Sequence, residues 1–159
     1  MIRLALYQPD IPQNAATLIR LGACLGVPVD IIEPCGFVLG GRNFQRAGMD
    51  YLELAVMQRH LSWDGFLAAF AQRGGRLILV TTRGNLAYTE FSFAANDMLL
   101  LGRETAGVPD AVHGRANARL VVPMLAGRRS LNLALAGAMV LGEALRQLAA
   151  FPARQQGAP

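Results

Sequence analysis

The chain has 159 residues, of which 53% are hydrophobic and 16% are charged, a balance that excludes a disordered chain and suits one domain with a substantial core. All 15 basic residues are arginine, so Schiff-base chemistry and a Walker-type phosphate loop, which both need lysine, are excluded. The net charge of +4 fits a polyanionic partner, because the arginine guanidinium donates bidentately to phosphate.

No segment predicts a membrane span, since the longest apolar run, residues 131–142, has about a dozen residues where a span needs roughly 20. The first residues lack the pattern of a signal peptide and are expected to form a strand. Cys24 and Cys35 lack metal-ligand spacing, and His60 and His113 are the only histidines. We therefore expect reduced thiols, no metal site and a cytoplasmic protein.

Apolar segments rich in Leu, Val and Ile alternate with segments of helical spacing along the chain. The apolar segments show little alternation with polar residues, as in a sheet that is covered on both faces. This order predicts a single α/β domain over residues 1–150 with a mainly parallel sheet covered by helices, followed by a frayed tail at residues 151–159. The predicted strands are residues 2–7, 29–33, 51–57, 76–82, 97–102 and 119–124.

Helices are expected between these strands and at the end of the domain. Asparagine and serine are good N-cap residues, and glycine is common just after a helix. The predicted helices are residues 14–26 with Asn14 as the N-cap, residues 62–73 beginning at Ser62, a short turn or helix after Pro109, and residues 130 to about 149 beginning at Ser130.

Two loops in the second half of the chain directly follow predicted strands. They are residues 102–109 and residues 122–132, and loops at the carboxyl ends of strands are where α/β proteins bind ligands. Gly102 would let a ligand approach the main chain, and a helix start near Ser130 would offer free N–H groups. An ordinary strand-to-helix connection explains the first loop equally well, and helix capping alone explains Ser130.

Several arginines are candidates for contacts with phosphate. Arg42 and Arg46 flank Phe44 in a glycine-bounded segment, which favours nucleic-acid binding through phosphate pairing and base stacking, or a plain mobile loop. Arg20 lies beside the predicted core stripe of its helix, where it is either a surface charge or a phosphate contact.

Taken in register, these segments resemble the SPOUT methyltransferases. Residues 13–20, 101–109 and 122–133 correspond to the three motifs of that family, in order, and the similarity extends from residue 2 to about residue 150. It is greatest to the tRNA (cytidine/uridine-34)-2′-O-methyltransferases, which methylate the ribose of the wobble nucleotide. The resemblance implies a C-terminal trefoil knot, a homodimer, and S-adenosylmethionine as the methyl donor.

The same resemblance implies roles for individual residues. Arg20 matches the catalytic arginine, although a guanidinium stays protonated and is a poor base, so the general base is unassigned. The implied cofactor-binding residues are Val80, Gly102, Val122, Ser130 and Leu131, and those expected to contact the tRNA anticodon stem-loop are Asn14, Arg42, Arg46, Arg83, Arg128 and Arg129.

The chain departs from the family pattern at Gly142, where many relatives carry tyrosine, so a role for that tyrosine does not transfer. Ala134 and Ala136 replace polar residues early in the last helix, and arginine replaces the lysines of the basic loops. Two alternatives stay open from the sequence: a methyltransferase of this family that acts on another RNA position, and a non-catalytic RNA-binding protein of the same fold.

Overall fold

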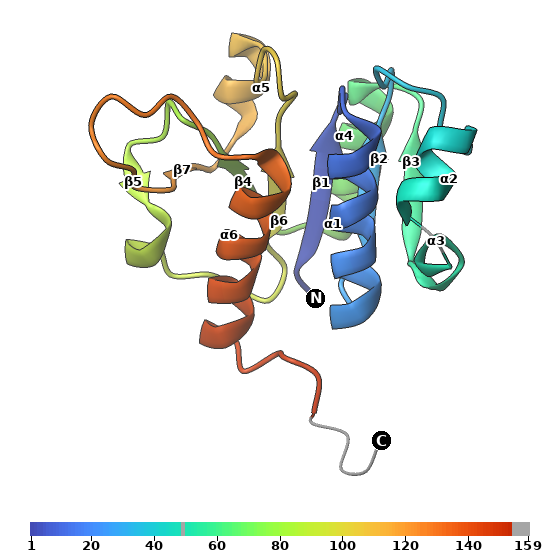
Figure 1. Cartoon of the computed structure of the whole chain (residues 1–159). Coiled ribbons are helices and arrows are strands. Elements are labelled where there is room, and N and C mark those ends of the chain that lie inside the picture. Colours follow the sequence, from blue (N-terminus) through green and yellow to red (C-terminus); the bar gives the residue numbers. More distant parts are fainter. Residues whose placement is uncertain (49, 154–159) are drawn as a thin grey trace.

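The structure is a computed structural model, and it describes residues 1–48 and 50–153. Within these residues seven strands form one sheet in the order β3-β2-β1-β6-β4-β7-β5, with every neighbouring pair parallel (Figure 1). The strands are β1 (Arg3–Tyr7), β2 (Val29–Ile32), β3 (Met57–His60), β4 (Leu77–Val80), β5 (Leu86–Ala87), β6 (Met98–Leu101) and β7 (Ala118–Val121).

Helices cover both faces of this sheet (Figure 1). Helices α1 (Pro12–Leu25) and α6 (Leu133–Gln147) cover one face, and α4 (Trp63–Arg73) and α5 (Asp110–Arg115) cover the other. The short helices α2 (Arg42–Gly48) and α3 (Tyr51–Leu54) pack against α1. None of the helices in the described residues is long and apolar enough to cross a membrane.

The order of the strands reverses between β1 and β6. From β1 the chain adds β2 and then β3 on one side, whereas β6, β4, β7 and β5 lie on the other. Because all strands are parallel, the carboxyl ends of β1, β6, β4 and β7 meet at one edge of the sheet. A crevice at the carboxyl ends of strands, beside such a reversal, is where open α/β sheets bind ligands.

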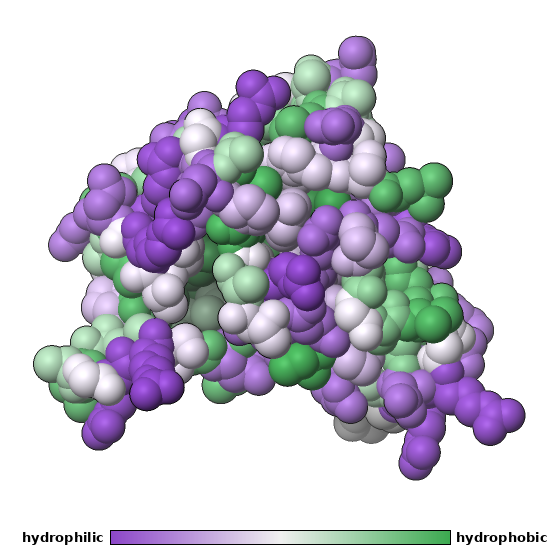
Figure 2. Space-filling model, turned by 90° about the horizontal axis from the view of Figure 1, so that it is seen from above, coloured by the Kyte–Doolittle hydropathy of each residue, from purple (hydrophilic) through white to green (hydrophobic). Residues whose placement is uncertain are grey.

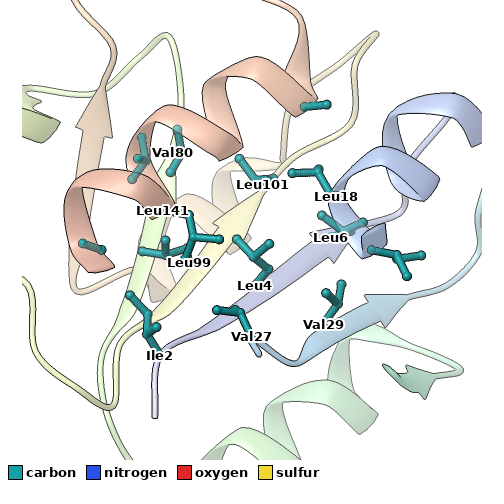
Figure 3. Close-up of a cluster of buried hydrophobic side chains, with 14 of the residues drawn as sticks. Ile2, Leu4, Leu6, Leu18, Val27, Val29, Val80, Leu99, Leu101 and Leu141 are labelled. Carbon is teal, nitrogen blue, oxygen red and sulfur yellow. The ribbon is translucent and has the colours of Figure 1, made fainter. Parts of the chain in front are cut away.

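The larger part of the core lies between the sheet and the helices α1 and α6 (Figure 3). Leu4 and Leu6 of β1 and Leu99 of β6 are almost fully buried there against Leu18 of α1 and Leu141 of α6. Each such side chain contributes about 1.5–3 kcal/mol through its burial. On the opposite face Phe66 of α4 is fully buried. These contacts fix the strands whose ends form the edge described above.

Five of the six predicted strands correspond to strands of the structure, and the strand predicted at residues 51–57 is wrong. Residues 51–54 form helix α3, and the strand begins only at Met57. Strand β3 lies at the edge of the sheet, where Gln58 and Arg59 are exposed, so its sequence lacks the apolar run of the central strands. The two-residue strand β5 and a 3₁₀ turn at Tyr88–Glu90 were not predicted.

Residues 40–48, predicted to form a glycine-bounded loop, also differ from the prediction. This segment contains helix α2, and Phe44 is only 3% exposed, with its ring stacked on Phe37 at 5.4 Å between centroids. This burial against the core overrides the local glycine signals. The ring is therefore not available to stack on a base, and that part of the expectation is wrong.

Two predicted helix starts are displaced. Helix α1 begins at Pro12, whose fixed φ suits the first helical turn, and not with Asn14 as its N-cap. Helix α6 begins at Leu133 and is capped by Asn132, not Ser130: Asn132 Oδ1 accepts from the N–H groups of Ala134 at 2.9 Å and Leu135 at 3.3 Å.

The other helix ends agree with prediction. Ser62 caps α4 by accepting from the N–H of Gly65 at 3.1 Å, Gly26 ends α1 with φ of +67°, and a short helix follows Pro109. Of the tail expected to fray, residues 154–159 lie outside the described residues.

Candidate functional site

A cavity of about 600 Å³ opens at the carboxyl edge of the sheet, where β4, β6 and β7 end beside the start of α6. Figure 2 looks onto this edge and shows a hollow bordered by hydrophilic residues. All five residues predicted to bind the cofactor line this cavity, together with three of those predicted to contact RNA: Val80, Gly102, Val122, Ser130 and Leu131, and Asn14, Arg83 and Arg129.

Gly102 makes one wall of the cavity from main chain. The loop after β6 closes on itself, since the N–H of Arg103 donates to the carbonyl of Gly107 at 2.9 Å and the N–H of Gly107 donates back at 3.0 Å. Gly107 has φ of +64°, which favours glycine. A Cβ on Gly102 would lie 2.8 Å from the carbonyl carbon of Gly107, so any side chain there would displace the loop.

Glu104 connects this loop to α1. One of its carboxylate oxygens accepts from the main-chain N–H of Asp10 at 2.8 Å, and the other accepts from Asn14 Nδ2 at 3.1 Å. Asn14 Oδ1 in turn accepts from Asn132 Nδ2 at 2.9 Å. We call Asn14, Glu104 and Asn132 the amide–carboxylate chain. It joins α1 and the loop after β6 to the N-cap of α6.

The sequence carried one signal for this chain of hydrogen bonds. Asn14 lies four residues before Leu18, on the stripe of α1 that faces the core, and it is only 8% exposed. A polar side chain at such a position needs hydrogen-bond partners inside the protein. The identity of those partners depends on the fold.

Asp10 fixes the same loop from the other side, which the sequence did not reveal. Its carboxylate accepts from Arg103 Nη2 at 2.6 Å and from Thr105 Oγ1 at 2.6 Å. The hydrogen bond from Arg103 holds the pKa of Asp10 below its ordinary value, and Thr105 acts in the same direction. The loop that carries Glu104 is therefore attached to the end of β1 by charged as well as main-chain hydrogen bonds.

The rim of the cavity carries a second ion pair. Arg83 Nη2 lies 2.7 Å from Asp110 Oδ1, and their side chains are 62% and 89% exposed. Such an exposed pair contributes little stability, so Arg83 can exchange Asp110 for another anion at small cost. His113 also lines the cavity, and its burial, together with Arg83 and Arg119, lowers its pKa, so its ring is neutral near pH 7.

The other predicted residues lie outside the cavity. Arg20 is on the exposed face of α1, where its Cζ lies 4.4 Å from the ring centroid of Tyr51. Arg42 and Arg46 are exposed on α2, and Arg128 is exposed in the loop before α6. No group of three or more His, Cys, Asp or Glu side chains that could hold a metal ion occurs within residues 1–48 and 50–153.

Comparison with known proteins gives one consistent result. The model of the SpoU rRNA Methylase family matches residues 1–142. A tRNA (cytidine(34)-2′-O)-methyltransferase of Ancylobacter novellus is 57% identical over 150 residues, covering 94% of this chain and 95% of that protein. The protein of the same name from Escherichia coli (strain K12) is 38% identical over 150 residues, covering 93% of this chain and 94% of the relative.

Solved structures agree with the sequence matches. A structure described as giving insight into the 2′-OH methylation of C/U34 on tRNA superimposes with a TM-score of 0.89 at 41% identity, covering 94% of this chain and 97% of the other. An AdoMet-bound rRNA methyltransferase from Sinorhizobium meliloti has a TM-score of 0.84 at 25% identity, covering 92% of this chain and 56% of the other.

The predicted resemblance and the α/β fold are thus confirmed. A family model that spans residues 1–142 and relatives that match along nearly their whole length show that this chain belongs to the SpoU rRNA methylase family.

Proposed function

We propose that this protein transfers a methyl group from S-adenosylmethionine to the ribose 2′-OH of the wobble nucleotide, position 34, of tRNA, where that nucleotide is cytidine or a modified uridine. The observation that carries the proposal is the cavity at the carboxyl edge of the sheet. It unites Val80, Gly102 and Val122, from three separate strand ends, with Ser130 and Leu131 before α6. The relatives named for this reaction support the choice of substrate.

The cavity suits S-adenosylmethionine in size and chemistry. Its volume of about 600 Å³ lies within the usual range for sites of small ligands and cofactors. The side chains of Val80, Val122 and Leu131 would pack against the adenine, and Gly102 lets the backbone of Gly107 approach closely, which fixes the main-chain wall beside it. Bound there, S-adenosylmethionine supplies an electrophilic methyl group on a sulfonium.

The protein's contribution to the transfer is alignment and charge stabilisation. A guanidinium is a cation and a poor base, so we assign Arg20 the role of a cation and not that of the base which removes the hydroxyl proton. We assign it to the phosphate beside the reacting ribose and to the negative charge that develops on the 2′ oxygen. An oxygen of that phosphate then accepts the proton.

A homodimer completes the site in this proposal. Arg20 does not line the cavity of its own chain, so a second copy is needed to bring Arg20 to it. Helix α6 offers a matching surface, since Leu131, Leu135 and Met139 are 40%, 59% and 42% exposed at its start and along one side. Apolar side chains grouped in this way are typical of protein interfaces. Because α1 packs beside α6, pairing through α6 brings α1 close to the partner.

The anticodon stem-loop is proposed to lie across the cavity mouth and the outer surface of α2. Arg83, Arg128 and Arg129 are exposed around the mouth, and Arg42 and Arg46 are exposed on α2. Their charges would pair with phosphates on both sides of the target nucleotide. Asn14 donates one Nδ2 hydrogen to Glu104, which leaves the second for the substrate.

We further propose the C-terminal trefoil knot that the family resemblance implies, formed by the loops at residues 102–109 and 122–132. We also propose a cytoplasmic location, where tRNA is modified. The free thiols Cys24 and Cys35 are consistent with a reducing compartment.

The test is methyl transfer from labelled S-adenosylmethionine to bulk tRNA from a strain that lacks this activity, followed by mapping of the labelled nucleotide. We expect label on the ribose of nucleotide 34. A synthetic anticodon stem-loop with 2′-deoxyribose at that position is the matched control and should receive none. Label at another nucleotide would establish a different RNA target, and cofactor binding without transfer to any RNA would establish a non-catalytic protein.

A further inference from the structure

The side chain of Arg20 rests on the ring of Tyr51, with the guanidinium carbon 4.4 Å from the ring centroid. We propose that Tyr51 is a positioning residue: it holds Arg20 by the face of the guanidinium and leaves the N–H edge directed to an RNA phosphate. The RNA substrate in this inference rests on the proposed function, whereas the contact between Arg20 and Tyr51 does not.

The contact joins two elements that the fold brings together. Arg20 lies on the exposed side of α1, and Tyr51 is the first residue of α3, which packs against α1. The N–H of Ala55 donates to the carbonyl of Tyr51 at 3.0 Å and closes the single turn of α3. The ring is half-buried while Arg20 is exposed, so the aromatic surface is the more fixed partner.

A stacked arginine differs chemically from one in an ion pair. The donors of a guanidinium lie in its plane, so a contact through its face consumes none of them. Elsewhere in this protein carboxylates occupy those donors: Asp97 binds Arg76, and Asp10 binds Arg103. Within residues 1–48 and 50–153, no carboxylate forms an ion pair with Arg20.

Tyr51 thus orders Arg20 without neutralising it. An arginine that must be immobilised on binding loses side-chain entropy, and an arginine already held on a ring loses less. Helix α2 also packs against α1 and exposes Arg42 and Arg46 near the same side of the fold, so a phosphate that reaches Arg20 enters a region of positive charge. A free guanidinium edge in such a region can bind a phosphate through two parallel hydrogen bonds.

The test compares Tyr51→Leu, Tyr51→Phe, Arg20→Ala and the double variant Arg20→Ala/Tyr51→Leu. A cation–π contact at an exposed site corresponds to about a 2- to 5-fold effect, so we expect Tyr51→Leu to lower kcat for methylation of nucleotide 34 by that factor. Tyr51→Phe should retain the rate because the ring is kept. In the Arg20→Ala background, Tyr51→Leu should have no further effect, and S-adenosylmethionine affinity should be unchanged throughout.

Nuclear magnetic resonance gives a readout that does not depend on activity. A ring current from Tyr51 should shift the side-chain protons of Arg20 upfield in the wild type and in Tyr51→Phe, and the shift should vanish in Tyr51→Leu. Phe91→Leu is a matched control, because Phe91 lies under Arg76, at 4.8 Å, away from the cavity. Tyr51→Met replaces Tyr51→Leu if the latter does not fold.

Equal losses from Tyr51→Leu with and without Arg20 would overturn the inference, because Tyr51 would then act by another route. An unchanged rate in Tyr51→Leu would overturn it as well. If the wild type failed to methylate nucleotide 34 while the ring-current shift was present, the proposed function would fall and the contact would stand.

Discussion

Replacing Gly102 by alanine tests whether the cavity wall depends on main chain. The added Cβ would lie 2.8 Å from the carbonyl carbon of Gly107 and 3.0 Å from its Cα and oxygen, and all three atoms belong to the backbone. No side-chain rotation relieves such a contact, so the loop at residues 103–107 must move. Forced repacking of this kind costs about 1–3 kcal/mol, and each kcal/mol lowers Tm by about 2–4 °C in a domain of this size.

The displaced loop carries Glu104, and its motion would also change the shape of the cavity. We therefore expect Gly102→Ala to lower Tm and to weaken S-adenosylmethionine binding about 10-fold or more in calorimetry. Gly114→Ala is the matched control: a Cβ there meets nothing within 4 Å, and alanine in α5 should leave Tm unchanged or raise it. Wild-type Tm and cofactor affinity in Gly102→Ala would refute the reasoning.

Three further predictions follow from the site. Arg20→Ala should lower kcat about 10²- to 10³-fold in the methylation assay while cofactor affinity stays unchanged, because a charge that stabilises the transition state is lost. The lowered pKa of Asp10 gives the folded protein stability that is present above the ordinary value of 3.8 and is lost as pH falls through the lowered value. We therefore expect Asp10→Asn to be less stable than the wild type near pH 7. In urea unfolding, the free energy of unfolding of Asp10→Asn should fall less steeply at acid pH than that of the wild type. Leu135→Glu places a charge on the exposed side of α6, and light scattering should report monomers in place of dimers.

Each of these has a result that would contradict it. Full methylation rate in Arg20→Ala under saturating tRNA would remove Arg20 from catalysis. If the free energy of unfolding fell equally steeply at acid pH in Asp10→Asn and in the wild type, the bond between Asp10 and Arg103 would not persist in solution. A Leu135→Glu protein that stays dimeric would move the interface to another surface, and Leu125→Glu, exposed in the loop before α6, is the control for an added charge.

The sequence predicted those parts of the fold in which local composition and burial agree. The strands around β1, β4 and β6 are continuous apolar runs because helices cover both faces, and Ser62 and Gly26 carry the usual chemistry of helix ends. Where tertiary contacts decide, prediction failed: α2 forms because Phe44 is buried against the core. The prediction of strand β3 failed for a different reason: it lies at the edge of the sheet, and its sequence lacks the apolar run on which the prediction relied.

The site shows the same division. Gly102 and Val122 were predicted as site residues because motifs surround them, and in the structure both line one cavity. The bond between Asp10 and Arg103 joins residues 93 positions apart, and neither residue has a neighbour that reveals the other. The position of Arg20 outside the cavity likewise follows from helix packing and not from any local pattern.

The amide–carboxylate chain has a consequence for the order in which the protein matures. Asn132 and Asn14 are 118 positions apart, and the cavity needs the segment that Asn132 anchors. Strand β1 pairs on one side with β6, which is synthesised much later. The amino-terminal half of the chain therefore leaves the ribosome with one edge of β1 unpaired. Competence to bind a ligand therefore arrives only after translation has passed α6, and a chain truncated before that helix would expose apolar surface without having gained a site.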